Sequence, residues 1–389
     1  MGHGMKLGTR LQPIPLHADR GISLARGEGS YLWDDHGRRY LDLMTNYGVN
    51  LLGHAHPQVT AAIDRQASLL TNAHQSFDTP ARQVFLDALA GFLPPLLSRI
   101  SFANSGAEAV EAALKYTRVA TGRTGMIATH RAYHGRTFGA LAATADAKYR
   151  DPFMPMMEGV RHVPFDNLPA MAEVMNDSIA AVIIEPIQGE GGIRVPADGY
   201  LKGLRELCTA HGSLLICDEI QTGFRTGAPL AFTREGIVPD ILCLSKSIAN
   251  GLPIGVTIVS DAISERVPKG SHGGTFSGNP LVCAAGVATL QVLADEDLHS
   301  RAAEKGKRFQ QRVRELGLSQ IREVRGRGLL LAVELKKPAT PVIRAMQERG
   351  VLVLPAGGTV IRFLPSILIQ DAQLDEGMDV LAEAIRQAG

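Results

Sequence analysis

The sequence has few of the features that mark secreted, metal-binding or nucleic-acid-binding proteins. Its 389 residues include only four cysteines, which form neither a Cys-x-x-Cys pair nor a metal-ligand spacing. The 40 basic and 39 acidic residues nearly cancel, so the charge gives no sign of a nucleic-acid or membrane partner. We therefore expect a cytoplasmic protein with reduced thiols, no bound metal, and no nucleic-acid or membrane partner.

Long uninterrupted apolar runs are also missing. The most apolar stretch, Asp240–Asp261 (DILCLSKSIANGLPIGVTIVSD), is broken by the turn-forming residues 250–255, which argues against a membrane span. We expect no secretory signal peptide at the start of the chain. Residues Met1–Gly4 are interpreted as an added remnant ahead of a natural start at Met5 and carry no further inference.

Short apolar runs alternate with helical patterns between about residues 100 and 260. The runs are ISFAN, GMIAT, AVIIEP, LLICDE, ILCLS and GVTIVS, and helical patterns such as Glu108–Ala120 and Tyr200–His211 lie between them. This alternation predicts an α/β domain with a mostly parallel sheet. Roughly ten residues separate the last two runs. That is too short for a crossover helix, so this pair is expected to be antiparallel.

The pattern changes after Pro280, which suggests a second domain. Helices are predicted over Leu281–Ala294, Arg301–Leu316 and near Val342–Glu348, with strands at 328–335, 351–354 and 360–364 and a last helix at the C-terminus. We predict a large domain over residues 51–280 and a smaller α+β domain over residues 281–389. The strand-like run at 31–43 could pair with either domain, and we expect the segment 1–50 to pack with the small one.

A single lysine stands in the apolar stretch between the last two predicted strands of the large domain. Burial at a strand end lowers the pKa of a lysine and makes its amine a nucleophile, so Lys246 is a candidate catalytic residue. Asp218 and Glu219 end the preceding strand, where either a helix cap or a ligand-binding role is possible. Ligands bind at the carboxyl ends of parallel strands, so an acid and Lys246 are expected to face one ligand.

The stretch FANSGAEAVEAALKY predicts a strand, a tight turn and a helix. Ser105 and Glu108 fit a capping box, and the same helix start points free N–H groups at an anion. Ser105 and Gly106 could therefore hold one phosphate. The motif is too short for a dinucleotide fingerprint, and the chain has no phosphate loop of the Gly-x-x-x-x-Gly-Lys type.

Polar residues after another predicted strand suggest a second part of the same site. Tyr133 beside His134 could stack on a flat ring, and Arg136 could bind a carboxylate through two hydrogen bonds, although a loose polar loop is the simpler interpretation. Glu185 lies at a strand end and Glu190 lies in a glycine-rich loop.

Further signals come from a glycine-rich loop and from a cation in an apolar strand. Thr275 in SHGGTFSGNP could donate to a phosphate, and Arg362 in TVIRFLP implies a fixed anionic partner. The histidines of GHAHP, at 54 and 56, have no third ligand nearby, so a helix start is favoured over a metal site. A lysine, an acid, an aromatic platform, an anion site and isolated arginines together indicate pyridoxal 5'-phosphate, which needs a lysine for its aldehyde, an acid for its ring nitrogen and an anion site for its phosphate.

The chain strongly resembles the class III aminotransferases, which are fold-type I pyridoxal-phosphate enzymes. The resemblance rests on an ordered set of blocks: GHAHP, NSGAEA, YHGRT, EPIQGEGG, DEIQTGFRTG, SK, GGTFSGNP and IRFLP. It implies a mostly parallel seven-stranded sheet in a large cofactor-binding domain, a smaller α+β domain, and a homodimer with composite active sites.

The resemblance also implies residue roles. Lys246 would bind the cofactor aldehyde, and Asp218 would pair with the ring nitrogen. Gln221 would lie near the ring hydroxyl, with Tyr133 stacked on the ring beside His134. Ser105, Gly106 and Ala107 would hold the phosphate, together with Thr275 of the neighbouring subunit. Arg136 would bind the donor's α-carboxylate. Arg362 would bind the α-carboxylate of 2-oxoglutarate, with Glu190 masking it in the other half-reaction.

Within the class, GTVIRFLPSILI is similar to the branch that acts on N-acetylornithine, or on lysine or ornithine attached to an amino-group carrier protein. A carrier-linked donor would add an acidic carrier protein as a partner. Tyr133, the SKSIANG segment and Gly274, at a position that lines the substrate pocket, differ from that branch. N-acetylornithine with 2-oxoglutarate is the favoured pair. Ornithine and 4-aminobutyrate are also candidate donors, and an aminomutase of the glutamate-1-semialdehyde type is the rival activity.

Overall fold

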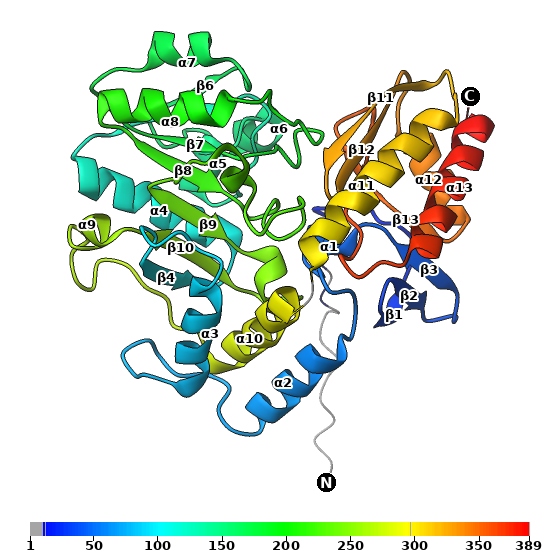
Figure 1. Cartoon of the computed structure of the whole chain (residues 1–389), viewed down its shortest axis with the longest axis horizontal. Coiled ribbons are helices and arrows are strands. Elements are labelled where there is room, and N and C mark those ends of the chain that lie inside the picture. Colours follow the sequence, from blue (N-terminus) through cyan, green and yellow to red (C-terminus); the bar gives the residue numbers. More distant parts are fainter. Residues whose placement is uncertain (1–10, 12, 296, 389) are drawn as a thin grey trace.

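Residue 11, residues 13–295 and residues 297–388 are described by the computed structural model, so the interpretation of Met1–Gly4 lies outside the described part of the chain. Figure 1 shows two lobes, the larger one formed by the middle of the chain and the smaller one by its C-terminal part with the first strands. None of the helices in the described residues is long and apolar enough to cross a membrane.

The larger lobe is built on a seven-stranded sheet with the order β4-β10-β9-β8-β7-β5-β6. Only β10 is antiparallel to its neighbours, β9 and β4. The mostly parallel sheet and the antiparallel β9–β10 pair are therefore confirmed. The apolar-run pattern missed β6, a short edge strand of sequence VRHV with two polar residues at its centre. The strands are β4 (Arg99–Ala103), β5 (Gly125–Thr129), β6 (Val160–Val163), β7 (Ile179–Ile184), β8 (Leu214–Asp218), β9 (Ile241–Leu244) and β10 (Gly255–Val259).

Both faces of this sheet are covered, which explains the unbroken apolar runs. Val182 and Ile184 of β7 belong to the core that contains α8 (Tyr200–His211). Ala181 and Ile183 belong to the core that contains α4 (Gly106–Thr121). Alternate residues of a strand point to opposite faces, so a strand buried on both sides has no polar positions.

Helix α10 (Pro280–Asp295) packs against α2 (Pro57–Ala67), α3 (Pro80–Ala90) and η3 (Lys246–Ala249), all in the larger lobe. The domain division at residues 50 and 280 stays a prediction, and this packing favours a boundary after α10 instead. The other helices of the larger lobe are α5 (Phe138–Ala143), α6 (Ala147–Arg150), η1 (Asp151–Phe153), α7 (Leu168–Val174), η2 (Ala231–Glu235) and α9 (Asp261–Ser264).

The smaller lobe contains two four-stranded sheets, of order β1-β2-β3-β13 and β11-β12-β15-β14. The predicted single strand at 351–354 is wrong: the chain changes partner at Val353, so that β13 pairs with β3 and β14 pairs with β15. The strands are β1 (Leu24–Glu28), β2 (Tyr31–Asp34), β3 (Arg39–Asp42), β11 (Ile321–Arg327), β12 (Leu330–Leu335), β13 (Val351–Leu352), β14 (Leu354–Ala356) and β15 (Val360–Phe363); the helices are α1 (Thr45–Gly48), α11 (Leu298–Glu315), α12 (Thr340–Glu348) and α13 (Asp371–Ala388).

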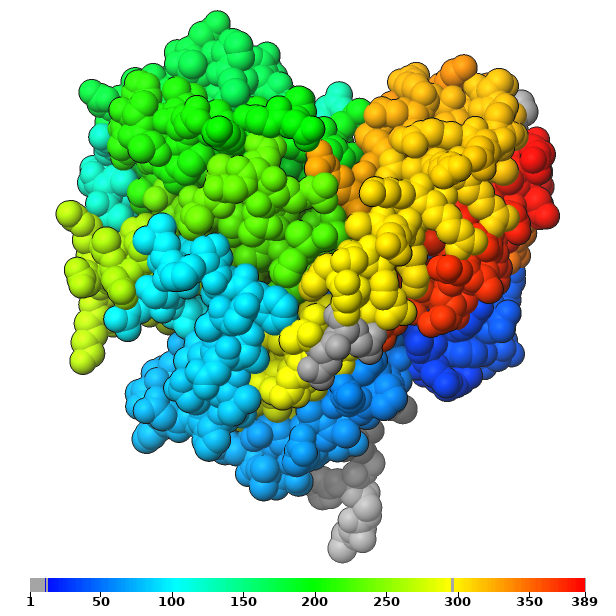
Figure 2. Space-filling view, in the orientation of Figure 1, coloured from blue at the N-terminus to red at the C-terminus, as the bar shows by residue number. Residues whose placement is uncertain are grey.

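The two lobes meet beside the carboxyl ends of the parallel strands. In the space-filling view of Figure 2, the segments drawn in green and in orange touch below a notch that separates the lobes. The loops that follow β5, β7, β8 and β9 approach β14 and the turn after it in the smaller lobe. Pro355 of β14 and Gly357 of this turn line the same cavity as Glu185 and Lys246.

Candidate active site

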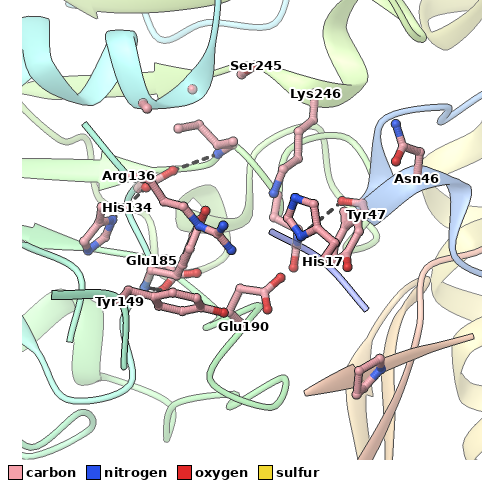
Figure 3. A pocket seen from close by; sticks show the side chains of 18 of the residues that line it. His17, Asn46, Tyr47, His134, Arg136, Tyr149, Glu185, Glu190, Ser245 and Lys246 are labelled. Carbon is pink, nitrogen blue, oxygen red and sulfur yellow. Dashed lines mark hydrogen bonds and ion pairs between the residues drawn. The ribbon is translucent and has the colours of Figure 1, made fainter. Parts of the chain in front are cut away.

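A cavity of about 1020 Å³ lies where the loops of the large sheet meet the smaller lobe. Its lining contains most of the predicted site residues: Gly106, Ala107, Tyr133, His134, Arg136, Glu190, Asp218, Gln221 and Lys246. Figure 3 shows Lys246 and Glu190 pointing into this space from opposite sides, with Arg136 between them and to one side. Residues from five separate predicted motifs therefore meet around one space.

Lys246 is held in an unusual backbone conformation at the end of β9. Its φ is 42°, in the left-handed region that residues other than glycine rarely adopt. The preceding residue, Ser245, is anchored through its hydroxyl, which donates to the carbonyl oxygen of Ile254 at 2.5 Å. Burial lowers the pKa of Lys246 to about 8, against a smaller opposing effect of Glu190. The amine is therefore far more often neutral near pH 7 than that of an ordinary lysine.

The two neighbouring acids at the end of β8 have different surroundings. Asp218 faces the cavity, and its Oδ2 accepts a hydrogen bond from Nδ1 of His134 at 2.7 Å. Burial would lower the pKa of His134, but the hydrogen bond and charge of Asp218 raise it. Glu219 instead accepts hydrogen bonds from the Thr222 hydroxyl and from the amide of Phe232. The structure thus separates a cavity-facing carboxylate from one that holds the following loop.

A second buried carboxyl group, Glu185, follows β7 and lines the cavity. Its Oε2 accepts from the amide of Tyr133 at 3.1 Å, and its Oε1 accepts from the amide of Gly189 at 3.0 Å. Burial raises its pKa to about 7, opposed by the nearby His134. Glu185 therefore joins the Tyr133 loop to the loop that carries Glu190.

The start of α4 lies at another part of the cavity. Ser105 Oγ accepts from the amide of Glu108, so this half of the predicted capping box is confirmed. The carboxylate of Glu108, however, accepts from the amide of Asn104 rather than from that of Ser105. The first backbone hydrogen bond of the helix runs from the amide of Ala109 to the carbonyl oxygen of Ser105. The amides of Gly106 and Ala107 come before it and have no partner within the helix, and Gly106 and Ala107 line the cavity.

Arg362, in the middle of β15, is fully buried and reaches the cavity through two partners. Its Nη2 donates to Oε1 of Glu190 at 2.7 Å, and its Nη1 donates to Oε1 of Gln221 at 3.1 Å. The anionic partner expected for Arg362 is thus Glu190 in this structure. The Glu190 side chain is 26% exposed, so it is not enclosed as its partner is.

Arg136 is exposed at the cavity and lies over aromatic rings. Its Cζ is 4.6 Å from the ring centroid of Tyr149 and 6.0 Å from that of Tyr133, and the two rings meet edge to face. Among the described residues it forms no ion pair with a carboxylate. This guanidinium is therefore available to an incoming anion.

Three predicted residues lie outside the lining of the cavity within one chain. Ser105 caps α4, whereas Gly274 and the exposed Thr275 lie in the loop after residue 270. The structure of a single chain thus does not bring Gly274 or Thr275 to the cavity, and their assigned roles stay predictions. His54, which was not expected to bind metal, is 2.7 Å from Oδ2 of Asp42 through its Nε2.

The motif search missed the contribution of the N-terminal segment. His17, Arg20, Asn46 and Tyr47 also line the cavity. Residues 45–48 all have positive φ, and this turn holds the Tyr47 ring 5.6 Å from Cζ of Arg362. Its carbonyl groups are fixed by Gln221, which donates to Tyr47 O, and by Arg225, which donates to Gly48 O. The only sequence signal was the glycine after Tyr47.

These groups fit pyridoxal 5'-phosphate. Lys246 has a lowered pKa suited to an aldehyde, and Asp218 is a buried, anchored carboxylate suited to a ring nitrogen. The free amides at the start of α4 suit the phosphate. A Cβ at Gly106 would come within 2.9 Å of the Ile220 side chain, so glycine allows the start of α4 to pack this closely against Ile220.

Comparisons with known proteins agree with this fit. The family model described as aminotransferase class-III matches residues 17–385. An acetylornithine aminotransferase of Methanothermobacter thermautotrophicus is 42% identical over 367 residues, which cover 94% of each chain. A LysW-aminoadipate semialdehyde/glutamate semialdehyde transaminase of Sulfolobus acidocaldarius is 42% identical over 376 residues, which cover 96% of this chain and 97% of that protein.

Solved structures show the same fold. An ornithine aminotransferase of Toxoplasma gondii, described with pyridoxal phosphate at partial occupancy in its active site, superposes with a TM-score of 0.90. It is 34% identical, and the match covers 96% of this chain and 91% of that one. Since the family model spans nearly the whole chain, the protein belongs to the class III aminotransferases, which have the type I fold and depend on pyridoxal 5'-phosphate.

Proposed function

We propose that the protein transfers the terminal amino group of an N-α-blocked diamino acid to 2-oxoglutarate, giving a semialdehyde and glutamate. N-acetylornithine is the favoured donor, and such a reaction belongs to arginine or lysine biosynthesis. The names of the two relatives support this choice, because one acts on acetylornithine and the other on LysW-linked semialdehydes.

The observation that carries the proposal is the ion pair between Arg362 and Glu190. An aminotransferase must bind two different substrates in turn at one lysine. A fully buried arginine suits the carboxylate of 2-oxoglutarate or glutamate, and a partly exposed Glu190 can cover it while a donor without a carboxylate at that end is bound. The pair thus provides a site that is positive for one substrate and neutral for the other.

The remaining residues divide the chemistry. When bound, pyridoxal 5'-phosphate supplies an aldehyde that bonds the donor's amine and a ring that withdraws electrons. The neutral amine of Lys246 accepts the proton from the carbon that bears this amine. Asp218, oriented by His134, holds the proton of the ring nitrogen. Arg136 binds the α-carboxylate of the donor, since it is exposed at the cavity and has no acidic partner among the described residues.

Donors attached to an acidic amino-group carrier protein are the second candidate, which the LysW-linked name of the Sulfolobus acidocaldarius relative favours. Free ornithine and 4-aminobutyrate are further candidate donors, and an aminomutase of the glutamate-1-semialdehyde type is the rival class. An aminomutase rearranges one molecule and needs no second oxo acid.

A screen of half-reactions tests the proposal. The cofactor-loaded protein is mixed with N-acetylornithine, ornithine, 4-aminobutyrate or a carrier-linked diamino acid, and the loss of the visible absorption of the lysine-bound cofactor is followed. We expect the N-α-blocked donors to react fastest. Product formation is then measured with and without 2-oxoglutarate. Turnover that persists without 2-oxoglutarate would replace the proposal by the aminomutase.

We further propose a cytoplasmic homodimer with composite active sites. Thr275 lies in an exposed loop outside the cavity of its own chain, which suits a contact with the phosphate bound by a second subunit. All four cysteines are buried and free, which suits a reducing compartment.

A further inference from the structure

Arg225 and Arg362 both have fully buried side chains, and the proposed function uses only Arg362. Arg225 lies in the loop between β8 and η2. Its Nη2 donates to the carbonyl oxygen of Gly48 at 2.6 Å, whereas its Nε and Nη1 are buried without a hydrogen-bond partner. Among the residues that the structure describes, no carboxylate forms an ion pair with Arg225.

The side chain of Arg225 therefore carries a positive charge that no described acidic residue neutralises. Burial, with a smaller contribution from the charge of Arg362, lowers the pKa of Arg225 to about 10. The guanidinium group is still protonated near pH 7. A buried charge without a partner lowers the stability of the fold, and proteins keep such features mainly where function requires them.

A series of hydrogen bonds joins the two buried arginines through the turn that carries Tyr47. Nη1 of Arg362 donates to Oε1 of Gln221 at 3.1 Å, and the side-chain amide of Gln221 donates to the carbonyl oxygen of Tyr47 at 3.3 Å. The next carbonyl group of the turn, that of Gly48, accepts from Arg225. The two guanidinium groups therefore hold consecutive carbonyl groups of one turn, one of them directly and the other through Gln221.

The charge of Arg225 is fixed in place by its contacts. Gly48 has a φ of 88°, and a Cβ at this glycine would lie 3.1 Å from Nη2 of Arg225, so the guanidinium group packs directly against the turn. The carbonyl oxygen of Arg225 accepts from the amide of Leu329, next to β12 of the smaller lobe, at 2.9 Å. Arg225 is thus held by both the N-terminal turn and the smaller lobe.

Arg225 lies near the part of the cavity that we assign to the oxo acid. Figure 3 shows Tyr47 on one side of the cavity and Arg136 on the other, and the ring of Tyr47 is 5.6 Å from Cζ of Arg362. While Glu190 covers Arg362, that ion pair is neutral and the charge of Arg225 remains. Once Glu190 moves away, two cations act on the carboxylate that replaces it.

We propose that Arg225 determines substrate specificity, because its buried positive charge favours the dicarboxylates 2-oxoglutarate and glutamate over the diamino donor. The inference rests on the proposed function, in which Arg362 binds a carboxylate of the oxo acid. The donor has no carboxylate at this end, so the charge does not strengthen its binding. Arg225 does not line the cavity, and it acts as a positioning residue on the carboxylate that Arg362 binds.

Two unreactive ligands test the proposal without turnover. Glutarate has two carboxylates, as 2-oxoglutarate does, whereas N-acetylnorvaline has only the α-carboxylate of the donor and lacks the terminal amine. Their affinities for the cofactor-loaded protein are measured by calorimetry at physiological ionic strength, since salt screens a buried charge only weakly. We expect Arg225→Met to weaken glutarate binding by about tenfold and N-acetylnorvaline binding by less than about twofold, because one cation near one carboxylate is lost.

Two further variants separate the charge from the hydrogen bond to Gly48. Arg225→Lys keeps the charge and should keep most of the affinity for glutarate. Arg225→Gln keeps a hydrogen-bond donor without the charge and should behave like Arg225→Met. In the half-reaction with glutamate, Arg225→Gln should raise the concentration that gives half the maximal rate by about tenfold and leave the maximal rate unchanged, since the charge contributes to binding alone.

Arg123→Gln is the matched control. Arg123 is partly buried and donates to the carbonyl oxygens of Ile179 and His211, so it resembles Arg225 in binding backbone carbonyl groups. It precedes β5 and therefore lies at the amino ends of the parallel strands, at the edge of the sheet opposite the cavity. Its substitution should change the affinity for neither ligand.

The stability of Arg225→Met distinguishes this role from a structural one. The substitution removes a buried charge without an acidic partner, and this relief should exceed the loss of the hydrogen bond to Gly48. The cofactor-loaded variant should therefore melt at a temperature no lower than that of the unmodified protein. A variant that does not fold, melts well below the unmodified protein or loses both ligands equally would show that Arg225 only holds the turn, and would overturn the proposal.

Two results with the other variants would also overturn it: unchanged glutarate affinity in Arg225→Gln, or equal losses in Arg225→Lys and Arg225→Gln. The binding test is independent of the proposed function. If no diamino donor reacts in the half-reaction screen while Arg225→Met selectively weakens glutarate, the proposed donor is wrong and the role of Arg225 stands. If N-acetylornithine reacts and glutarate affinity does not depend on Arg225, the role of Arg225 alone is wrong.

Discussion

The lowered pKa of Lys246 predicts how the cofactor-free protein takes up its cofactor as pH changes. Only the neutral amine attacks an aldehyde. With a pKa of about 8, about one tenth of the Lys246 amine is neutral at pH 7. An exposed lysine at its ordinary pKa would be neutral in only about 0.03% of molecules. Burial therefore raises the reactive fraction by about 300-fold at this pH.

Stopped-flow mixing of cofactor-free protein with pyridoxal phosphate measures this effect. The rate at which visible absorption appears should rise about fivefold between pH 7 and pH 8, and about tenfold in all before it levels off above pH 9. Lys246→Ala should show no such band, and borohydride should not attach the cofactor to it. A rate that keeps rising beyond pH 10, or a yellow Lys246→Ala protein with covalently fixed cofactor, would refute the reasoning.

The same pKa makes a prediction about stability, with a definite sign. Because the folded-state pKa lies below that of the unfolded chain, the unfolded state binds more protons between about pH 8 and pH 10.5. Below pH 8 the folded cofactor-free protein carries the whole penalty, about 3 kcal/mol, and the penalty disappears as pH rises to 10.5. Lys246→Met should therefore be more stable than the unmodified cofactor-free protein at pH 7 in urea unfolding, by up to this amount, and the difference should vanish near pH 10.5.

Three further predictions concern the substrates and the second subunit. Arg362→Ala should lower the catalytic efficiency with 2-oxoglutarate and glutamate by roughly thirty- to thousand-fold, because a buried arginine–carboxylate pair contributes on the order of 2–4 kcal/mol. Arg136→Ala should chiefly slow the half-reaction with N-acetylornithine. If Arg362→Ala slows both half-reactions equally in single-turnover measurements, the two arginines do not serve different substrates. Glu190→Ala should raise reactivity toward glutamate relative to the diamino donor, and an unchanged ratio of the two rates argues against masking. Thr275→Ala should weaken cofactor retention while Lys246 still binds the cofactor, and a fully active monomer in light scattering excludes the composite site.

The local chemistry of the site could be predicted from short stretches of sequence. Lys246 stands alone between two apolar runs, and Ser105 precedes a helix with an acid three residues later. These patterns depend on burial at strand ends and on helix capping, both of which act over a few residues. Six of the seven strands of the large sheet followed for the same reason, since strands buried on both faces are visible as unbroken apolar runs, whereas the edge strand β6 was not visible in this way.

Pairings across long stretches of chain could not be predicted in this way. Asp218 and Glu219 are adjacent and chemically alike, and the structure separates them: Glu219 accepts hydrogen bonds from Thr222 and from the amide of Phe232, whereas Asp218 faces the cavity. β13 joins one sheet by pairing with β3, which lies more than three hundred residues earlier in the chain. β14 joins the other sheet by pairing with β15, which lies about eight residues later. The sequence of residues 351–354 does not show with which strands they pair.

The sequence by itself indicated the cofactor class, because a lysine between apolar runs, an acid at a strand end and a capped helix start are each visible in a short stretch of residues. The tertiary structure decided which substrate groups the cavity can hold. Glu190 and Arg362 are 172 residues apart, yet they form one ion pair, and Tyr47 reaches the same arginine from the N-terminal segment. A second cavity, of about 550 Å³, is likewise lined by Arg131 and Arg194 of one lobe and by Arg322 of the other. Electrostatic complementarity to a substrate depends on distances between side chains, and those distances are set when the two lobes pack together.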